Sequence, residues 1–281
     1  MRFPIFFCLI APDLAIAEPL KAMKSAVSLA TQLNAQLSVA IGALQVSVPN
    51  LWNSATIKEL VAAEHERSMN SASFAQKKIL ALANTTTIKI HTEILKGDFN
   101  QLKARLAARA RNHGLVFVEK GASYELLGGT LVEPLLFESG RPVMVVPHGF
   151  AAEFSFSRVL IAWDGSASAA RAVWDSIAFL TLANTIEIVT VVGEKDLRDV
   201  SAATELSDML SYLKKKINVT VLTYDGAAVS GMIQQHAAKT GADLIVQGAY
   251  GRSRWAEFIL GGVTRQTLLN STLPVLMSHQ G

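Results

Sequence analysis

Short apolar runs alternate along the chain with longer stretches in which apolar residues recur at helical spacing. This alternation of strand and helix patterns predicts an α/β fold with a mostly parallel sheet. The expected strands are 6–11, 36–44, 87–95, 115–118 and 142–146 in the first half, and 158–163, 186–192, 219–224, 243–246 and 274–277 in the second. The expected helices are 19–33, 56–83, 99–112, 131–138, 168–182, 199–216, 229–239 and 263–270.

The two halves of this pattern match each other in sequence as well as in order. The matching segments are 9–13 with 160–164, 128–131 with 261–264, and 141–145 with 273–277. An internal duplication is the simplest explanation. It predicts two tandem Rossmann-like domains, 1–150 and 151–281, each a five-stranded, mostly parallel sheet flanked by helices. A linker is expected at 147–156.

The composition indicates a globular protein and argues against nucleic-acid-binding, disulfide-rich and membrane-spanning classes. The 281 residues are 50% hydrophobic and 17% charged, which suits two packed domains. The net charge is +3, and the longest basic run, 214–216, is interpreted as a solvated helix end, so nucleic acid is not an expected partner. The single Cys8 offers no disulfide framework. No apolar stretch reaches the roughly 20 residues needed to span a membrane.

The N-terminus resembles a signal peptide in part. Arg2 precedes an apolar run, and Ala15-Ile16-Ala17 resembles a cleavage site. Pro4 interrupts the run, however, and the duplication requires 6–13 as a core strand. A cytoplasmic location is therefore expected.

A glycine-rich segment, 247–269, joins the strand expected at 243–246 to the helix expected at 263–270. It holds four glycines: Gly248, Gly251, Gly261 and Gly262. Glycines at such a junction let the backbone approach a phosphate, and the first N–H groups of the helix are free to donate to it. The same glycines suit a plain connecting loop, and the spacing alone leaves both interpretations open. The corresponding first-half loop, 119–127, is shorter and keeps only Gly121.

With this motif the chain resembles the universal stress protein family in its tandem, two-domain form. Nucleotide-binding members carry a glycine, two residues, a glycine, nine residues, and then a glycine followed by Ser or Thr. Gly248, Gly251 and Gly261 match this spacing, whereas Gly262 replaces the Ser or Thr. Val263 matches the hydrophobic residue that follows. The resemblance is specific in the second half and degenerate in the first, and it implies adenine-nucleotide alpha-hydrolase-like domains.

The resemblance also implies an adenine-nucleotide site in the second domain. Asp164, at the end of its first strand, would accept hydrogen bonds from ribose hydroxyls or the adenine amine, or would instead cap the helix expected from Ser168. Val191 would lie beside the adenine. Gly248 and Gly251 would let the loop fold over the phosphates, and three backbone amides would donate to them from the helix start. These amides belong to Gly262, Val263 and Thr264.

The loop itself offers further candidates. Ser253, Thr264 or Arg252 can replace the hydroxyl missing at Gly262, a hydrogen bond worth about 0.5–1.5 kcal/mol. Arg252 and Arg254 either neutralise phosphate charge or are exposed loop cations. The expected ligand is ATP, or AMP or ADP, with Mg allowed as an accompanying ion.

The sequence motifs of several other nucleotide-binding and hydrolytic sites are absent. There is no Walker sequence, no G-x-G-x-x-G after a strand and no G-x-S-x-G. The six His residues form no cluster, so no metal site is expected, and His236 is interpreted as a surface or packing residue. No general base or nucleophile-positioning residue stands out, so no catalytic residue is expected.

The leading hypothesis is a stress-response binding or signalling protein that takes an adenine nucleotide. The alternatives are an interaction protein without nucleotide and a slow ATPase. The resemblance further implies that strands 142–146 and 274–277 pair, which would make the chain an intramolecular pseudo-dimer and leaves room for a homodimer.

Overall fold

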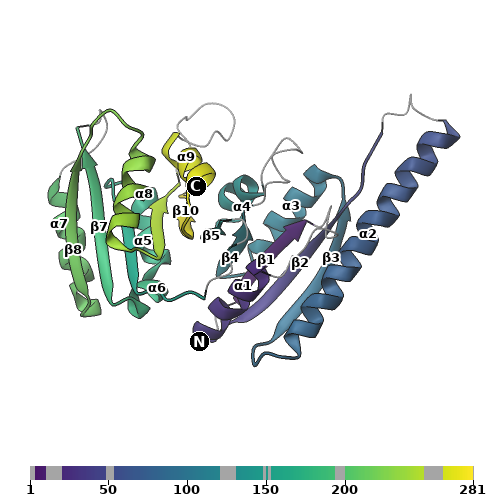
Figure 1. Ribbon diagram of the computed structural model, residues 1–281, viewed down its shortest axis with the longest axis horizontal. Coiled ribbons are helices and arrows are strands. Elements are labelled where there is room, and N and C mark those ends of the chain that lie inside the picture. The colour runs from purple at the N-terminus through teal and green to yellow at the C-terminus, as the bar shows by residue number, and fades with distance from the viewer. Residues whose placement is uncertain are drawn as a thin grey trace. The chain divides into compact units, whose positions relative to one another are not determined.

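The computed structural model describes residues 4–10, 21–48, 54–120, 131–147, 150, 153–193, 200–249 and 262–280 (Figure 1). Contacts divide these residues into two compact units. The first holds residues up to Glu119 together with 131–139, and the second holds residues from Phe154 onward. The segment Gly140–Pro147 comes from the first half of the sequence but is part of the second unit.

The first unit contains a parallel sheet with strand order β3-β2-β1-β4. The strands are β1 (Pro4–Ile10), β2 (Gln36–Leu44), β3 (Ile90–Gly97) and β4 (Leu115–Glu119). The helices are α1 (Lys21–Gln32), α2 (Ala55–Ala83), α3 (Phe99–Ala110) and α4 (Val132–Glu138). The long α2 packs along β2 and β3 (Figure 1). Ser54 and Asp98 cap α2 and α3 by accepting hydrogen bonds from backbone N–H groups of the first turn.

The second unit contains six strands in the order β5-β10-β9-β6-β7-β8. The strands are β5 (Val143–Val146), β6 (Arg158–Ala162), β7 (Thr185–Val192), β8 (Lys216–Thr223), β9 (Leu244–Gly248) and β10 (Val275–Ser278). The helices are α5 (Ala167–Asp175), α6 (Ile177–Leu182), α7 (Val200–Leu210), α8 (Val229–Thr240) and α9 (Gly262–Asn270). All neighbours pair in parallel except β5, which runs antiparallel to β10.

The α/β fold with mostly parallel sheets is confirmed, and each half of the sequence contributes five strands to the described residues, as predicted. The last strands of the two halves, β5 and β10, do pair, with Met144 opposite Leu276. Contacts assign β5 to the second unit, so four of the strands belong to the first unit and six to the second.

Two helix predictions were wrong in detail. The helix expected at 168–182 is two helices, α5 and α6, which meet at Ser176. The Ser176 hydroxyl donates to the carbonyl of Val173 at 2.7 Å, a local bond that competes with regular helix geometry.

The helix expected at 199–216 ends earlier, at Leu210 of α7, and is followed by a short 3-10 turn. Lys214 then adopts a left-handed conformation with φ 55°, and β8 begins at Lys216. The lysines at 214–216 are thus not a helix end, because they form the turn that leads into an edge strand.

The sheet of the second unit has helices on both faces. A side chain at Gly248 of β9 would point at the start of α5, because its Cβ would lie 2.5 Å from the backbone nitrogen of Ala169. Glu187 of β7 instead reaches His236 of α8. Strand register places Gly248 and Glu187 on opposite faces, so α5 and α8 cover opposite faces.

Candidate functional site

The strand order of the second unit changes direction at β6, which lies between β9 and β7. Ligands of parallel α/β sheets bind beyond the carboxyl ends of the strands at such a switch point. Asp164 follows the end of β6, Val191 is the last residue but one of β7, and Gly248 is the last residue of β9. Three residues singled out from the sequence therefore lie at the same edge of one sheet.

Asp164 forms a tight turn at this edge. Its Oδ1 accepts a hydrogen bond from the backbone N–H of Ser166 at 3.0 Å, and Gly165 between them has φ 70°. The residue that caps α5 is Ser166, whose hydroxyl accepts from Ala169 N–H at 3.0 Å. The expectation that Asp164 could serve as the helix cap is therefore wrong, because Ser166 occupies that position. The turn fixes one carboxylate oxygen of Asp164 at the end of β6.

Gly248 is required by packing within the protein. An added Cβ would lie 2.5 Å from the nitrogen of Ala169 and 2.7 Å from the carbonyl carbon of Ser168, closer than real Cβ atoms come. Both contacts are to the backbone at the start of α5, which cannot rotate away. The absence of a side chain at Gly248 thus lets the start of α5 lie directly against the end of β9.

The start of α9 supplies the remaining described part of the predicted site. Gly262 is the first helical residue and is exposed, with open space where a Cβ would be. Val263 is 38% exposed, and Thr264 is buried. Backbone N–H groups in the first turn of a helix have no partner within it, so they can donate to an anion. Four predicted site residues lie outside the described residues: Gly251, Arg252, Ser253 and Gly261.

Unpaired polar atoms gather at the same edge. Among the described residues, four buried side-chain atoms have no hydrogen-bond partner: Ser68 Oγ, Trp163 Nε1, Gln247 Nε2 and Ser278 Oγ. The last three lie at the carboxyl ends of β6, β9 and β10, which are neighbours in the sheet. Register places Ser278 on the same face of the sheet as Gly248, and Gln247 on the opposite face. A buried donor without a partner costs about 1–3 kcal/mol, so each of these atoms marks a point where a group from outside the protein can complete the bonding.

The sequence prediction missed Trp163, Gln247 and Ser278. A signal was present for Gln247, because a carboxamide stands in a strand that otherwise reads Leu-Ile-Val before Gly248. Trp163 and Ser278 stand at strand ends, where polar residues are ordinary, and gave no such signal.

The corresponding strand of the first unit, β4, ends differently. β4 pairs with β1 as β9 pairs with β6, and β4 ends in Glu119 where β9 ends in Gly248. This difference agrees with the shortened loop that follows β4 in the sequence.

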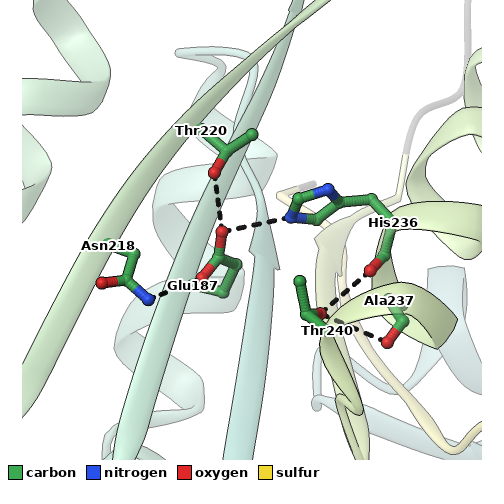
Figure 2. A network of polar contacts seen from close by, with 6 residues as sticks. All are labelled: Glu187, Asn218, Thr220, His236, Ala237 and Thr240. Atoms are coloured by element: carbon green, nitrogen blue, oxygen red, sulfur yellow. Dashed lines mark hydrogen bonds and ion pairs between the residues drawn. The ribbon is translucent and has the colours of Figure 1, made fainter.

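A second polar cluster lies on the α8 face of the second unit, away from the strand ends (Figure 2). Glu187 is 3% exposed. Its Oε1 accepts from the hydroxyl of Thr220 at 2.7 Å and bonds Nε2 of His236 at 3.1 Å, while Oε2 accepts from Nδ2 of Asn218 at 3.0 Å. An ionised carboxylate only accepts, so Nε2 of His236 is the donor.

Opposing effects set the pKa of Glu187. Burial raises it, but the hydrogen bonds from Thr220, Asn218 and His236, with the attraction of the His236 charge, outweigh burial and lower the pKa below its ordinary value. The carboxylate therefore stays ionised and ties β7, β8 and α8 together. His236, interpreted from the sequence as a surface or packing residue, is a half-buried member of this network, with its side chain 13% exposed.

The part of the chain that the structure describes holds neither a metal-binding cluster nor a membrane-spanning helix. No group of three or more His, Cys, Asp or Glu side chains is placed there to hold a metal ion. None of the described helices combines the length and apolar character needed to cross a membrane.

Residues 155–279 match the model of the Universal stress protein family. The chain is also 25% identical over 268 residues to universal stress protein Slr1230 of Synechocystis sp. (strain ATCC 27184 / PCC 6803 / Kazusa), a match that covers 88% of this chain and 86% of that protein.

Two solved structures share the fold over nearly the whole chain. A universal stress protein from Archaeoglobus fulgidus DSM 4304 gives a TM-score of 0.70 at 16% identity, with 98% of each chain covered. The functionally unknown protein PA1789 from Pseudomonas aeruginosa PAO1 gives a TM-score of 0.60 at 16% identity, covering 99% of this chain and 92% of that one.

Residues 155–279 thus match the universal stress protein family, as their glycine spacing predicted, a relative from that family is similar over most of the chain, and the solved structures share its fold.

Proposed function

We propose that the second domain, 151–281, binds an adenine nucleotide at the carboxyl ends of β6, β7 and β9, and that the chain acts as a stress-response binding protein. The observation that carries the proposal is the position of Asp164, Val191 and Gly248 around the switch point of the sheet. Ligands of this class of fold bind there.

Each described residue has a definite part in this proposal. Asp164 accepts from ribose hydroxyls or the adenine amine with the oxygen that its turn leaves uncommitted. Val191 contributes an apolar surface for the base. The backbone N–H groups of Gly262, Val263 and Thr264 donate to phosphate oxygens from the start of α9, where the helix dipole favours negative charge. ATP, AMP and ADP all fit these roles, with Mg as an accompanying ion of the phosphates.

The first domain, 1–150, is proposed as a partner without its own nucleotide, because the loop that follows β4 is shorter and keeps only Gly121. The antiparallel pairing of β5 with β10 supports an intramolecular pseudo-dimer of the two sequence halves. A homodimer and a cytoplasmic location stay predictions.

A second candidate is an interaction protein that keeps the fold without the nucleotide. The observation that favours it is Gly262, which offers no hydroxyl to a phosphate. Calorimetric titration with ATP separates the two candidates, because only the first releases or absorbs heat.

Replacing Asp164 by alanine is expected to weaken ATP binding by about 10- to 150-fold, since a hydrogen bond to a charged group is worth about 1.5–3 kcal/mol. Dissociation constants from calorimetry measure the effect. The matched control is Asp175→Ala, which removes a carboxylate of the same unit whose partner is Arg171 at 2.9 Å. Equal affinities for the Asp164→Ala variant and the unaltered protein would remove Asp164 from the site.

Restoring the hydroxyl with Gly262→Ser is expected to tighten ATP binding by about 2- to 10-fold, the equivalent of one neutral hydrogen bond. The added side chain meets open space, so the fold can accept it. Gly262→Ala adds the same Cβ without the hydroxyl and separates helix stabilisation from phosphate contact. If serine binds ATP no better than alanine, the start of α9 does not contact the phosphates.

A further inference from the structure

We propose that Gln247 is the specificity-determining residue of this site and that its carboxamide hydrogen-bonds the base of the bound purine nucleotide. The inference rests on the proposed function and names the part of the ligand that the strand ends recognise.

Gln247 is a polar side chain in a strand that is otherwise apolar. It lies between Val246 and Gly248 in β9, is 4% exposed, and its Nε2 has no hydrogen-bond partner among the described residues. Packing alone would be served better by an apolar residue, as at Ile245 and Val246. A carboxamide is stable there when a group from outside the protein pairs with it.

The direction of the Gln247 side chain follows from its neighbour. Gly248 faces α5, so Gln247 points to the opposite face of the sheet. Register places it on the same face as Val191 and Glu187, the face that α8 covers. Gln247 and the proposed base contact Val191 are thus on one face, on either side of β6.

The chemistry of the group indicates which part of a nucleotide it recognises. A carboxamide is neutral and presents a donor and an acceptor in one plane, which matches the paired acceptor and amine on the edge of adenine. Phosphates are served instead by the backbone N–H groups at the start of α9. The apolar side chain of Val191 on the same face suits a base and not a charged group.

The test is a near-isosteric replacement, Gln247→Met, measured in the full chain by calorimetry with ATP and with inosine triphosphate, which carries an oxygen in place of the adenine amine. The variant is expected to bind ATP about tenfold more weakly than the unaltered protein and to lose most of its preference for ATP over inosine triphosphate. Exposed Gln235 of α8 provides the control, Gln235→Met, for which both affinities should be unchanged.

Thermal unfolding without nucleotide gives a second readout. Gln247→Met removes an unpaired buried donor, so its midpoint is expected to equal or exceed that of the unaltered protein. Lower stability together with unchanged ATP affinity would overturn the inference, because Gln247 would then serve the fold alone. An unaltered preference for ATP over inosine triphosphate would also overturn it. Failure of the unaltered protein to bind either nucleotide would instead refute the proposed function itself. Gln247→Leu repeats the test should the methionine variant fold poorly.

Discussion

Replacing Glu187 by alanine is expected to lower the free energy of unfolding by about 3 kcal/mol, the upper end of the cost of leaving a buried hydrogen-bonding group without its partner. The carboxylate is 3% exposed and accepts from Thr220, Asn218 and His236, all of which lose their partner in the variant. Asn218 and Thr220 are only half-buried and can turn partly to water, which keeps the cost from rising further. Urea unfolding of the full chain measures the change.

The control for this prediction is an exposed ion pair of the same unit. Arg171 lies 2.9 Å from Asp175 and its side chain is 50% exposed, so Arg171→Ala should cost no more than about 1 kcal/mol. Equal losses in the two variants would show that the Glu187 network does not hold β7, β8 and α8 together.

The pH dependence of stability provides an independent test of the same network. The pKa of Glu187 is lowered in the folded state, so its carboxylate stabilises the fold above the unfolded value of about 4.3, and this contribution is lost as the pH falls through the lowered native value. The stability difference between the unaltered protein and Glu187→Gln should therefore shrink from about pH 6 to about pH 3. A difference that grows on acidification would contradict the direction of the pKa change.

Replacing Gly248 by alanine is expected to lower the free energy of unfolding by about 3 kcal/mol, the upper end of the usual cost of overpacking. The new Cβ would lie 2.5 Å and 2.7 Å from backbone atoms of Ala169 and Ser168, so either β9 or the start of α5 must shift. Because Ser166 caps α5 at this point, the shift also disturbs the turn that holds Asp164. Thermal and urea unfolding measure the loss.

Gly262→Ala is the matched control, since it adds a Cβ to another glycine of the same motif, at a position where nothing lies within 4 Å. It should leave stability unchanged or slightly raised, because alanine favours helices more than glycine does. If both alanine variants are equally stable, the contact between α5 and β9 is looser than described.

Local periodicity was enough to predict the alternation of strands and helices. Strands buried on both faces are continuous apolar runs, whereas helices that flank a sheet carry apolar residues three and four positions apart. β2 and α2 illustrate this, since their observed bounds lie within one residue of the predicted ones. The end of α7 was missed because the left-handed turn at Lys214 uses a residue with no turn preference in the sequence.

The sequence predicted the part of the site that depends on the order of strands and helices, but not the part that depends on tertiary packing. The strand ends that carry Asp164, Val191 and Gly248 follow from the order of elements. Which helix approaches Gly248 depends on tertiary packing, so its contact with α5 could not be foreseen. The partners of Glu187 come from β8 and α8, which are distant in sequence, and only the lone carboxylate within an apolar strand hinted at them. The unpaired amide of Gln247 likewise became visible only once its surroundings were known.

Calorimetric titration of the full chain with ATP and AMP at physiological salt tests the central claim most directly. We predict saturable heat with one site per chain, and its loss or strong weakening in Asp164→Ala. No heat and no thermal shift at millimolar nucleotide would contradict the claim that the second domain binds an adenine nucleotide.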